Sequence, residues 1–223
     1  MNARPLRVAV LAIGFALVGL VGLVAAFDGP DTYRDIARAS GVTETVFRSP
    51  PDLVWRVDLN GLVDLHQRTL AYVLGDAAGL PAFAKTARPL FDDNERSHMA
   101  DVRAVFQATK LSFVAGVFIV LGVLRWTDRP LRLRLIRDAA ISAGIGVAAI
   151  AVVAVVAFDP LFLLFHEVFF PQGNFLFGPD SNLLAVYPDE YWYGVTLRIG
   201  FSFAAAMAVV AFAATATLRQ AHR

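Results

Sequence analysis

Four long apolar runs constrain this chain more than any other feature of its sequence. Residues 8–27 and 139–158 carry no charged side chain, residues 105–126 carry one lysine before Arg125, and residues 195–218 carry only Arg198. A helix of twenty residues rises about 30 Å, which is the thickness of the hydrocarbon core of a bilayer. The sequence therefore predicts an all-α membrane protein with four transmembrane helices at about 8–27, 105–126, 139–158 and 195–218.

Composition agrees with a membrane protein and excludes several function classes. Hydrophobic residues make up 57% of the chain, above the usual share in a soluble domain. A net charge of +1 gives no argument for nucleic acid as a partner. The absence of cysteine excludes disulfides, thiolate metal ligands and a cysteine nucleophile.

Arginines near the ends of the four runs predict the orientation. They gather near the N-terminus, between the second and third runs, and at the C-terminus (Arg4, Arg7, Arg125, Arg129, Arg132, Arg134, Arg137, Arg219, Arg223). By the positive-inside rule these ends are cytoplasmic. Segments 28–100 and 159–194 are then extracytoplasmic, and we expect one membrane domain over 1–223 in the bacterial cytoplasmic membrane. Val24-Ala25-Ala26 could also be a signal-peptidase site, although twenty uncharged residues are long for the apolar region of a signal peptide.

Helical patterns in segment 28–100 predict a small helical cap. Asp31 is placed to cap a short helix ending at Gly41, and apolar residues recur at helical spacing from about Asp58 to Leu74. Asp92-Asp93-Asn94-Glu95 then suits the start of the helix that leads into the second run.

Two of the four histidines lie where an ionisable side chain near hydrocarbon needs a partner or a function. His98 shares a helix face with Asp101, which could fix its tautomer and leave one ring nitrogen as a base. His166 follows the Asp159-Pro160 break, so we expect it on a re-entrant or interfacial segment. The topology puts both histidines on one side of the membrane. His66 is more consistent with a structural residue of the cap, and the tail residue His222 has no inferred role.

Other residues near these histidines have two interpretations. The phenylalanines at 165, 169, 170, 175 and 177 suit lipid contact or packing, and Arg198 could reach the membrane surface or hold an ester oxygen.

His166-Glu167 begins like a zinc-protease helix, but Phe170 stands where the second ligand should be. A metal site using His98, His166 and Asp101 has no spacing signature, so we expect no metal.

The motifs Glu95-x-x-His98-Met99-x-Asp101-Val102, Phe165-His166-x-x-Phe169-Phe170 and Pro188-x-x-x-Trp192, on four spans in this order, resemble the Lit-type lipoprotein intramolecular transacylases. The resemblance implies an enzyme that moves the sn-2 acyl chain of a diacylglyceryl-cysteine lipoprotein to the α-amine of that cysteine, giving a lyso-form lipoprotein. It implies catalytic roles for His98, His166 and Asp101. The chain departs from the family near Asn174-Phe175, where Trp is usual, and at Asp189, where Glu is usual.

The chemistry is consistent with these residues. One imidazole could take a proton from the amine and the other return one to the glycerol oxygen, contributing roughly 10²–10⁴-fold. We expect substrate contacts from Arg198, Phe169, Phe170 and Trp192, a diacylglyceryl-modified lipoprotein and membrane lipids as partners, and no cofactor. Two alternatives are a non-catalytic lipid-binding or accessory protein and a metal-dependent intramembrane hydrolase. The sequence does not predict an oligomeric state.

Overall fold

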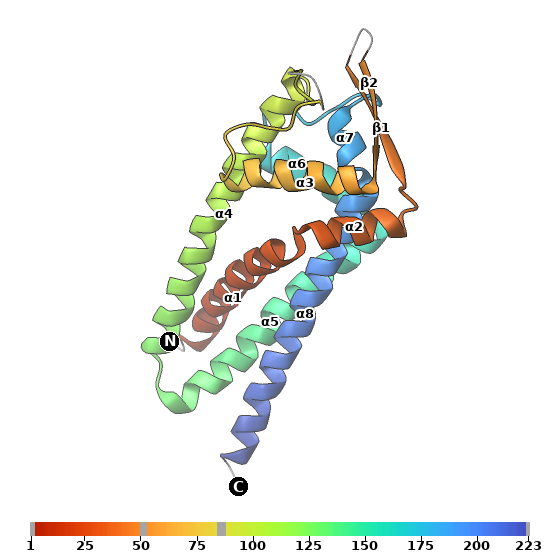
Figure 1. Ribbon diagram of the computed structural model, residues 1–223. Helices are drawn as coiled ribbons and strands as arrows, with labels where there is room; N and C mark the ends of the chain where they lie inside the picture. Colours follow the sequence, from red (N-terminus) through yellow and green to blue (C-terminus); the bar gives the residue numbers. More distant parts are fainter. Residues whose placement is uncertain (1–2, 50–52, 84–87, 222–223) are drawn as a thin grey trace. The chain divides into compact units, whose positions relative to one another are not determined.

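The computed structural model of the protein describes residues 3–49, 53–83 and 88–221, so His222 and Arg223 lie outside the described residues (Figure 1). The chain divides into two compact units. Unit 1 contains residues up to Ala26, Thr109–Val156 and the chain from Thr196, and unit 2 contains Phe27–Ala108 and Ala157–Val195. The prediction of one domain over 1–223 stays a prediction.

Four helices of the described chain are long and apolar enough to cross a membrane. They are α1 (Arg4–Phe27), α4 (Asp93–Arg125), α5 (Arg129–Val156) and α8 (Asp189–Gln220). Each overlaps one predicted span, so hydropathy located all four. α5 begins ten residues before 139, so this helix extends beyond the predicted third span. Of the arginines predicted between the second and third spans, Arg125 ends α4, and the others lie in the first turns of α5, consistent with the good helix propensity of arginine.

Glycines let the helices of unit 1 pack closely. A Cβ atom on Gly14 of α1 would lie 2.9 Å from the Ile119 Cγ2 atom, and one on Gly116 of α4 would lie 2.8 Å from the Leu17 Cβ atom. Small residues commonly allow such backbone approach between membrane helices. Arg4 also pairs with Asp138 of α5 at 2.6 Å.

Unit 2 contains the shorter elements. These are α2 (Pro30–Ala39), β1 (Glu44–Ser49), β2 (Leu53–Asp58), α3 (Leu59–Leu74), α6 (Phe158–Phe169) and α7 (Asn182–Val186), with the first turns of α4 and α8. Their buried apolar side chains form one core that includes Phe47, Leu62, Phe91 and Met99.

The chain is mostly helical, as predicted, but segment 28–100 is not helical throughout, because β1 and β2 form an antiparallel hairpin that pairs Phe47 with Trp55. Both strands are rich in the β-branched and aromatic residues that favour strands, so a local signal was present. Phe47 is fully buried and its ring lies 5.9 Å from that of Trp55, which ties the hairpin to the core.

The predicted helices of this segment are present, with one correction. The Asp58 side chain accepts a hydrogen bond from the Gly61 N–H and caps α3, which stops at Gly75 in the left-handed conformation (φ 94°). Asp31 does not cap α2, because Gly29 holds the cap position and Pro30, which lacks an N–H, opens the helix. Asp31 instead pairs with Arg34 at 3.3 Å.

Candidate active site

The start of α4 is fixed by a reciprocal cap that positions His98. The Glu95 N–H donates to the Asp92 Oδ1 atom at 2.8 Å, and the Asp92 N–H donates to the Glu95 Oε2 atom at 2.9 Å. This is the capping-box pattern, which satisfies two backbone donors at once. His98 follows within one turn of Glu95 and is only 6% exposed.

Glu95 also holds the chain before α8. Its Oε1 atom accepts hydrogen bonds from the Ser181 hydroxyl and, at 2.9 Å, from the Leu183 N–H. Glu95 is 2% exposed, so all of these bonds are made away from water. One buried carboxylate thus joins the first turn of α4 to α7.

His166 lies on α6, which begins after a break at Ala157. Pro160 is in the first turn of α6, where a missing N–H costs little. The predicted break is therefore present, while its depth in a membrane stays a prediction. The His166 Nδ1–H donates to the Phe162 carbonyl oxygen at 2.8 Å, because a carbonyl can only accept. The neutral ring then has its free lone pair on Nε2.

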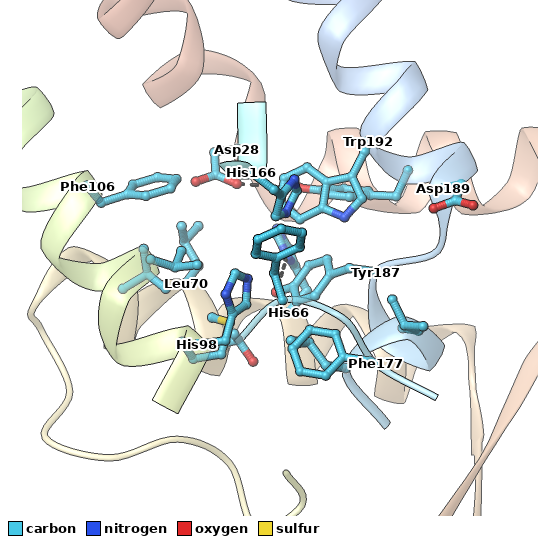
Figure 2. A pocket seen from close by; sticks show the side chains of 18 of the residues that line it. Asp28, His66, Leu70, His98, Phe106, His166, Phe177, Tyr187, Asp189 and Trp192 are labelled. Carbon is cyan, nitrogen blue, oxygen red and sulfur yellow. Dashed lines mark hydrogen bonds between the residues drawn. The ribbon is translucent and has the colours of Figure 1, made fainter. Parts of the chain in front are cut away.

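The two imidazoles lie side by side. Their ring centroids are 5.9 Å apart and their planes differ by 22°. Phe170 packs at the edge of both rings, with its centroid 4.7 Å from that of His98 and 5.4 Å from that of His166. Figure 2 shows both histidines at one cavity. The structure brings together two histidines that are 68 residues apart in the sequence.

Asp101 does not bind His98 as expected, because other side chains occupy its carboxylate. Its Oδ2 atom accepts hydrogen bonds from the Gln172 and Asn174 side-chain amides, each at 2.6 Å. Both donors lie between α6 and α7. The carboxylate therefore anchors the segment that follows His166.

Asn174 connects Asp101 to His98. The His98 Nδ1 atom and the Asn174 Oδ1 atom are both buried, and within the described residues neither has a partner at normal hydrogen-bond geometry. The two side chains are near enough to interact, although they form no hydrogen bond in this structure. If the pair closes, His98 carries its proton on Nδ1 and Nε2 is free. Asp101 would then orient the ring through Asn174.

The cavity contains only some of the predicted substrate-contacting residues. Trp192 lines it, together with Phe162, Phe175 and Phe177. Phe170 is 3% exposed and packs on the histidine pair, whereas Phe169 is 48% exposed. Arg198 lies on α8 within unit 1, and its role stays a prediction.

A second polar cluster lines the same cavity and was not predicted. His66 of α3 is 1% exposed, stacks on Tyr33 with centroids 4.6 Å apart, and has its Nδ1 atom 3.1 Å from the Tyr187 hydroxyl. Burial lowers the pKa of His66 to about 4, against the effect of a polar contact with the Asp28 backbone. This neutral, packed ring agrees with the structural role expected for His66.

Asp28 is the acidic member of this cluster. It follows the last residue of α1, lines the cavity, and accepts a hydrogen bond from the Tyr191 hydroxyl at 3.4 Å. Burial raises its pKa to about 7, and the Tyr191 hydrogen bond partly opposes this shift. The only sequence signal for Asp28 was its position directly after twenty uncharged residues.

Within residues 3–49, 53–83 and 88–221, no group of three or more His, Asp or Glu side chains is arranged to hold a metal ion. His98, His166 and Asp101 in particular do not converge, since the Asp101 Oδ2 atom is bound by two amides.

Comparison with solved structures shows a shared fold. The in meso structure of the membrane integral lipoprotein intramolecular transacylase Lit from Bacillus cereus has a TM-score of 0.74 and 14% identity, covering 99% of this chain and 97% of that one. A variant of that protein with one histidine replaced by alanine gives a TM-score of 0.69 and 14% identity, covering 98% and 95% of the two chains. At this identity the structures establish a shared fold.

Sequence comparisons identify the family. An uncharacterized protein of Aquifex aeolicus (strain VF5) is 27% identical over 162 residues, which are 67% of this chain and 69% of that protein. The family model for the lipoprotein intramolecular transacylase Lit matches residues 56–192, which include His66, both paired histidines, Asp101 and Trp192. The chain therefore belongs to the Lit family of lipoprotein intramolecular transacylases, which are membrane-integral acyltransferases.

Proposed function

We propose that this protein moves the sn-2 acyl chain of a diacylglyceryl-cysteine lipoprotein to the α-amine of the same cysteine, which gives a lyso-form lipoprotein. The pairing of His98 and His166, with centroids 5.9 Å apart at one cavity, is the observation that carries this proposal. The reaction forms an amide bond, breaks an ester bond and needs proton transfer at both ends. Two adjacent imidazoles suit these transfers.

His98 is the proposed base. After the neutral amine has attacked the ester carbonyl, its nitrogen is positively charged. The proton that this nitrogen then loses passes to Nε2 of His98. The contact with Asn174 supports the tautomer in which this nitrogen is free. Asp101 supports His98 by holding Asn174 at 2.6 Å, and so acts as a positioning residue.

His166 is the proposed acid. Its Nδ1–H is held by the Phe162 carbonyl, so Nε2 is the nitrogen that exchanges protons. Neutral His166 has no proton there, so it has to receive one, from the His98 imidazolium or from water, before it protonates the departing glycerol oxygen. Swapped roles for the two rings give the same proton balance.

The cavity lining suits a lipid ester. Leu70, Val102 and Phe106 supply apolar surface near the histidines, and Trp192 supplies an aromatic face. Amine and ester belong to one molecule, so the site mainly has to fold that molecule and stabilise the developing oxyanion. We further propose that both termini are cytoplasmic and that unit 2 is extracytoplasmic, on the basis of the arginine distribution.

Expression in bacterial cells that make only diacyl lipoproteins tests this proposal. Mass spectrometry of lipopeptides from those cells should show the N-acyl lyso form with the natural protein and only the diacyl form with His98→Ala or His166→Ala. Glu167→Gln is the matched control, since Glu167 is exposed beside His166. Finding only diacyl lipopeptides with the natural protein would refute the activity, and full activity of both histidine variants would refute the residue assignment.

A further inference from the structure

Asp28 is a partly buried carboxyl group that the mechanism above does not use. It lines the same cavity as His98 and His166. Among the described side chains that line this cavity, the acids are Asp28 and Asp189, and none is a lysine or arginine. Asp189 is exposed in the first turn of α8, whereas Asp28 is partly buried.

The groups around Asp28 do not neutralise it. Its carboxylate accepts a hydrogen bond from the Tyr191 hydroxyl, which is neutral, and its raised pKa is caused by burial and not by a neighbouring charge. The adjacent His66 is also uncharged near neutral pH, because its pKa is about 4. A carboxylate in such a place is costly unless a cation accompanies it.

The proposed substrate supplies a cation to this cavity. The α-amine of a lipidated cysteine has an ordinary pKa of roughly 8, so it arrives mostly as an ammonium group. That ammonium has to lie beside the histidine pair for the reaction to occur.

From this placement, and resting on the proposed function, we infer that Asp28 is the residue that binds the α-ammonium group of the lipoprotein substrate and takes its first proton. In this step the ammonium N–H bond breaks and an O–H bond forms on Asp28. The ammonium–carboxylate pair becomes a neutral amine and a neutral carboxylic acid. No other reactant is needed.

Physical chemistry favours this transfer inside the cavity. Two charged groups become two neutral groups, and an apolar environment penalises the charged pair most. The raised pKa of Asp28, about 7, brings it close to that of the amine, so the proton moves with little cost. The neutral amine can then attack the ester while His98 takes the second proton. Asp28 returns its proton to water when the product leaves.

The inference also gives a basis for substrate selection. A free α-amine meets a matching carboxylate, whereas an N-acylated cysteine brings an amide that carries no charge. The N-acyl product is therefore released more readily than the substrate. Asp28 would thus distinguish substrate from product by charge.

Binding to a catalytically inactive variant tests this inference without requiring turnover. Purified His98→Ala protein in detergent micelles would be titrated with two ligands. One is a synthetic diacylglyceryl-cysteine lipopeptide with a free α-amine, and the other is the same compound with hydrogen in place of that amine. We expect the amine ligand to bind roughly 10- to 100-fold more tightly, which is the usual range for a hydrogen bond to a charged group.

A second substitution in the His98→Ala protein identifies the carboxylate that causes the preference for the amine ligand. Asp28→Asn should remove the preference, so that both ligands bind equally, and Asp189→Asn should retain it. The ligand without an amine serves as the folding control, because its affinity should not change in either variant. If Asp28→Asn fails to bind that ligand as well, Asp28→Glu replaces it and should keep the preference, since its carboxylate still meets the ammonium.

Three results would overturn the inference. They are equal affinity for the two ligands in the His98→Ala parent, a preference that persists in Asp28→Asn, and loss of the preference in Asp28→Glu with normal binding of the control ligand. None of these outcomes depends on acyl transfer, so failure of this inference can be distinguished from failure of the proposed function.

Discussion

The imidazole rings of His98 and His166 lie 5.9 Å apart, centroid to centroid, and nearly parallel. One ring comes from the first turns of α4 and the other from the last turn of α6. A close pair of imidazoles can move a proton from the attacking amine to the departing glycerol oxygen, directly or through one water.

Removal of either imidazole should stop catalysis with little effect on folding. We expect His98→Ala and His166→Ala to lower kcat by about 10²–10⁴-fold, which is the usual contribution of a general acid or base. Initial rates of lyso-lipopeptide formation by the purified variants would measure this. Glu167→Gln should keep the natural rate, and a variant of either histidine with more than half the natural rate would contradict the assignment.

Asp101 and Asn174 should act as one unit. Asp101→Ala frees two amide donors between α6 and α7, and Asn174→Ala removes the side chain between that carboxylate and His98. Each change should lower kcat, and the double variant should lose no more than the worse single variant, because both changes break one connection. Gln172→Ala is the matched control and should have a smaller effect. Multiplicative losses in the double variant would show that the two residues act separately.

Glu95 should matter for stability far more than Asp92. Glu95→Ala removes the cap of α4 and the hydrogen bonds to Ser181 and Leu183 at a buried position. We expect a loss of about 3–5 kcal/mol in the free energy of unfolding, against about 1 kcal/mol for Asp92→Ala, which removes a single cap acceptor. Chemical unfolding in detergent would compare the two variants. Similar losses would mean that the link from Glu95 to α7 contributes little.

Asp28 and His66 should give opposite pH dependences of stability. The Asp28 pKa is raised to about 7, so this group stabilises the folded protein at low pH and loses that effect between about pH 4 and 7. The His66 pKa is lowered to about 4, so its contribution is present above about pH 6.5 and is lost as the pH falls toward 4. Burial also lowers the pKa of His98 to about 4, so in the natural protein the Asp28 effect is opposed by both histidines.

Single substitutions should reveal each effect. Relative to the natural protein, His66→Gln loses one contribution that grows as the pH rises, so its free energy of unfolding should change less favourably, by a few kcal/mol to order of magnitude, between about pH 4 and 7. Asp28→Asn leaves the His66 contribution, so stability should rise over about pH 4 to 6.5. Unfolding curves in detergent at several pH values would measure both slopes. A slope that changes in the same direction in both variants, relative to the natural protein, would contradict the assigned pKa directions.

The sequence predicted the parts of the fold that local patterns determine. Apolar length located α1, α4, α5 and α8, and the repeat of apolar residues with Asp58 at its start located α3. The hairpin was missed because only helical patterns were recognised in segment 28–100, although the β-branched and aromatic residues Val46, Phe47, Val54 and Trp55 flank a pair of prolines. The pattern of buried and exposed residues in these strands can be recognised only when the core on which they pack is known.

The site was predictable where topology alone brought residues together. Both histidines were placed on one side of the membrane from the arginine distribution, and their rings are paired in the structure. The bonds of Asp101 to Gln172 and Asn174 join residues more than 70 positions apart, and no local pattern indicates such a pairing. Asp28 likewise reaches the cavity only through the packing of unit 2.

The most direct test uses a purified lipopeptide with different acyl chains at sn-1 and sn-2. Transfer within one molecule produces an isomer, so tandem mass spectrometry should find an unchanged total mass with the sn-2 chain now on nitrogen. Mild alkali should then release the sn-1 chain and leave the sn-2 chain attached, because an amide resists that treatment. Loss of one acyl chain as a free acid, or two chains still released by alkali, would contradict acyl transfer by this protein.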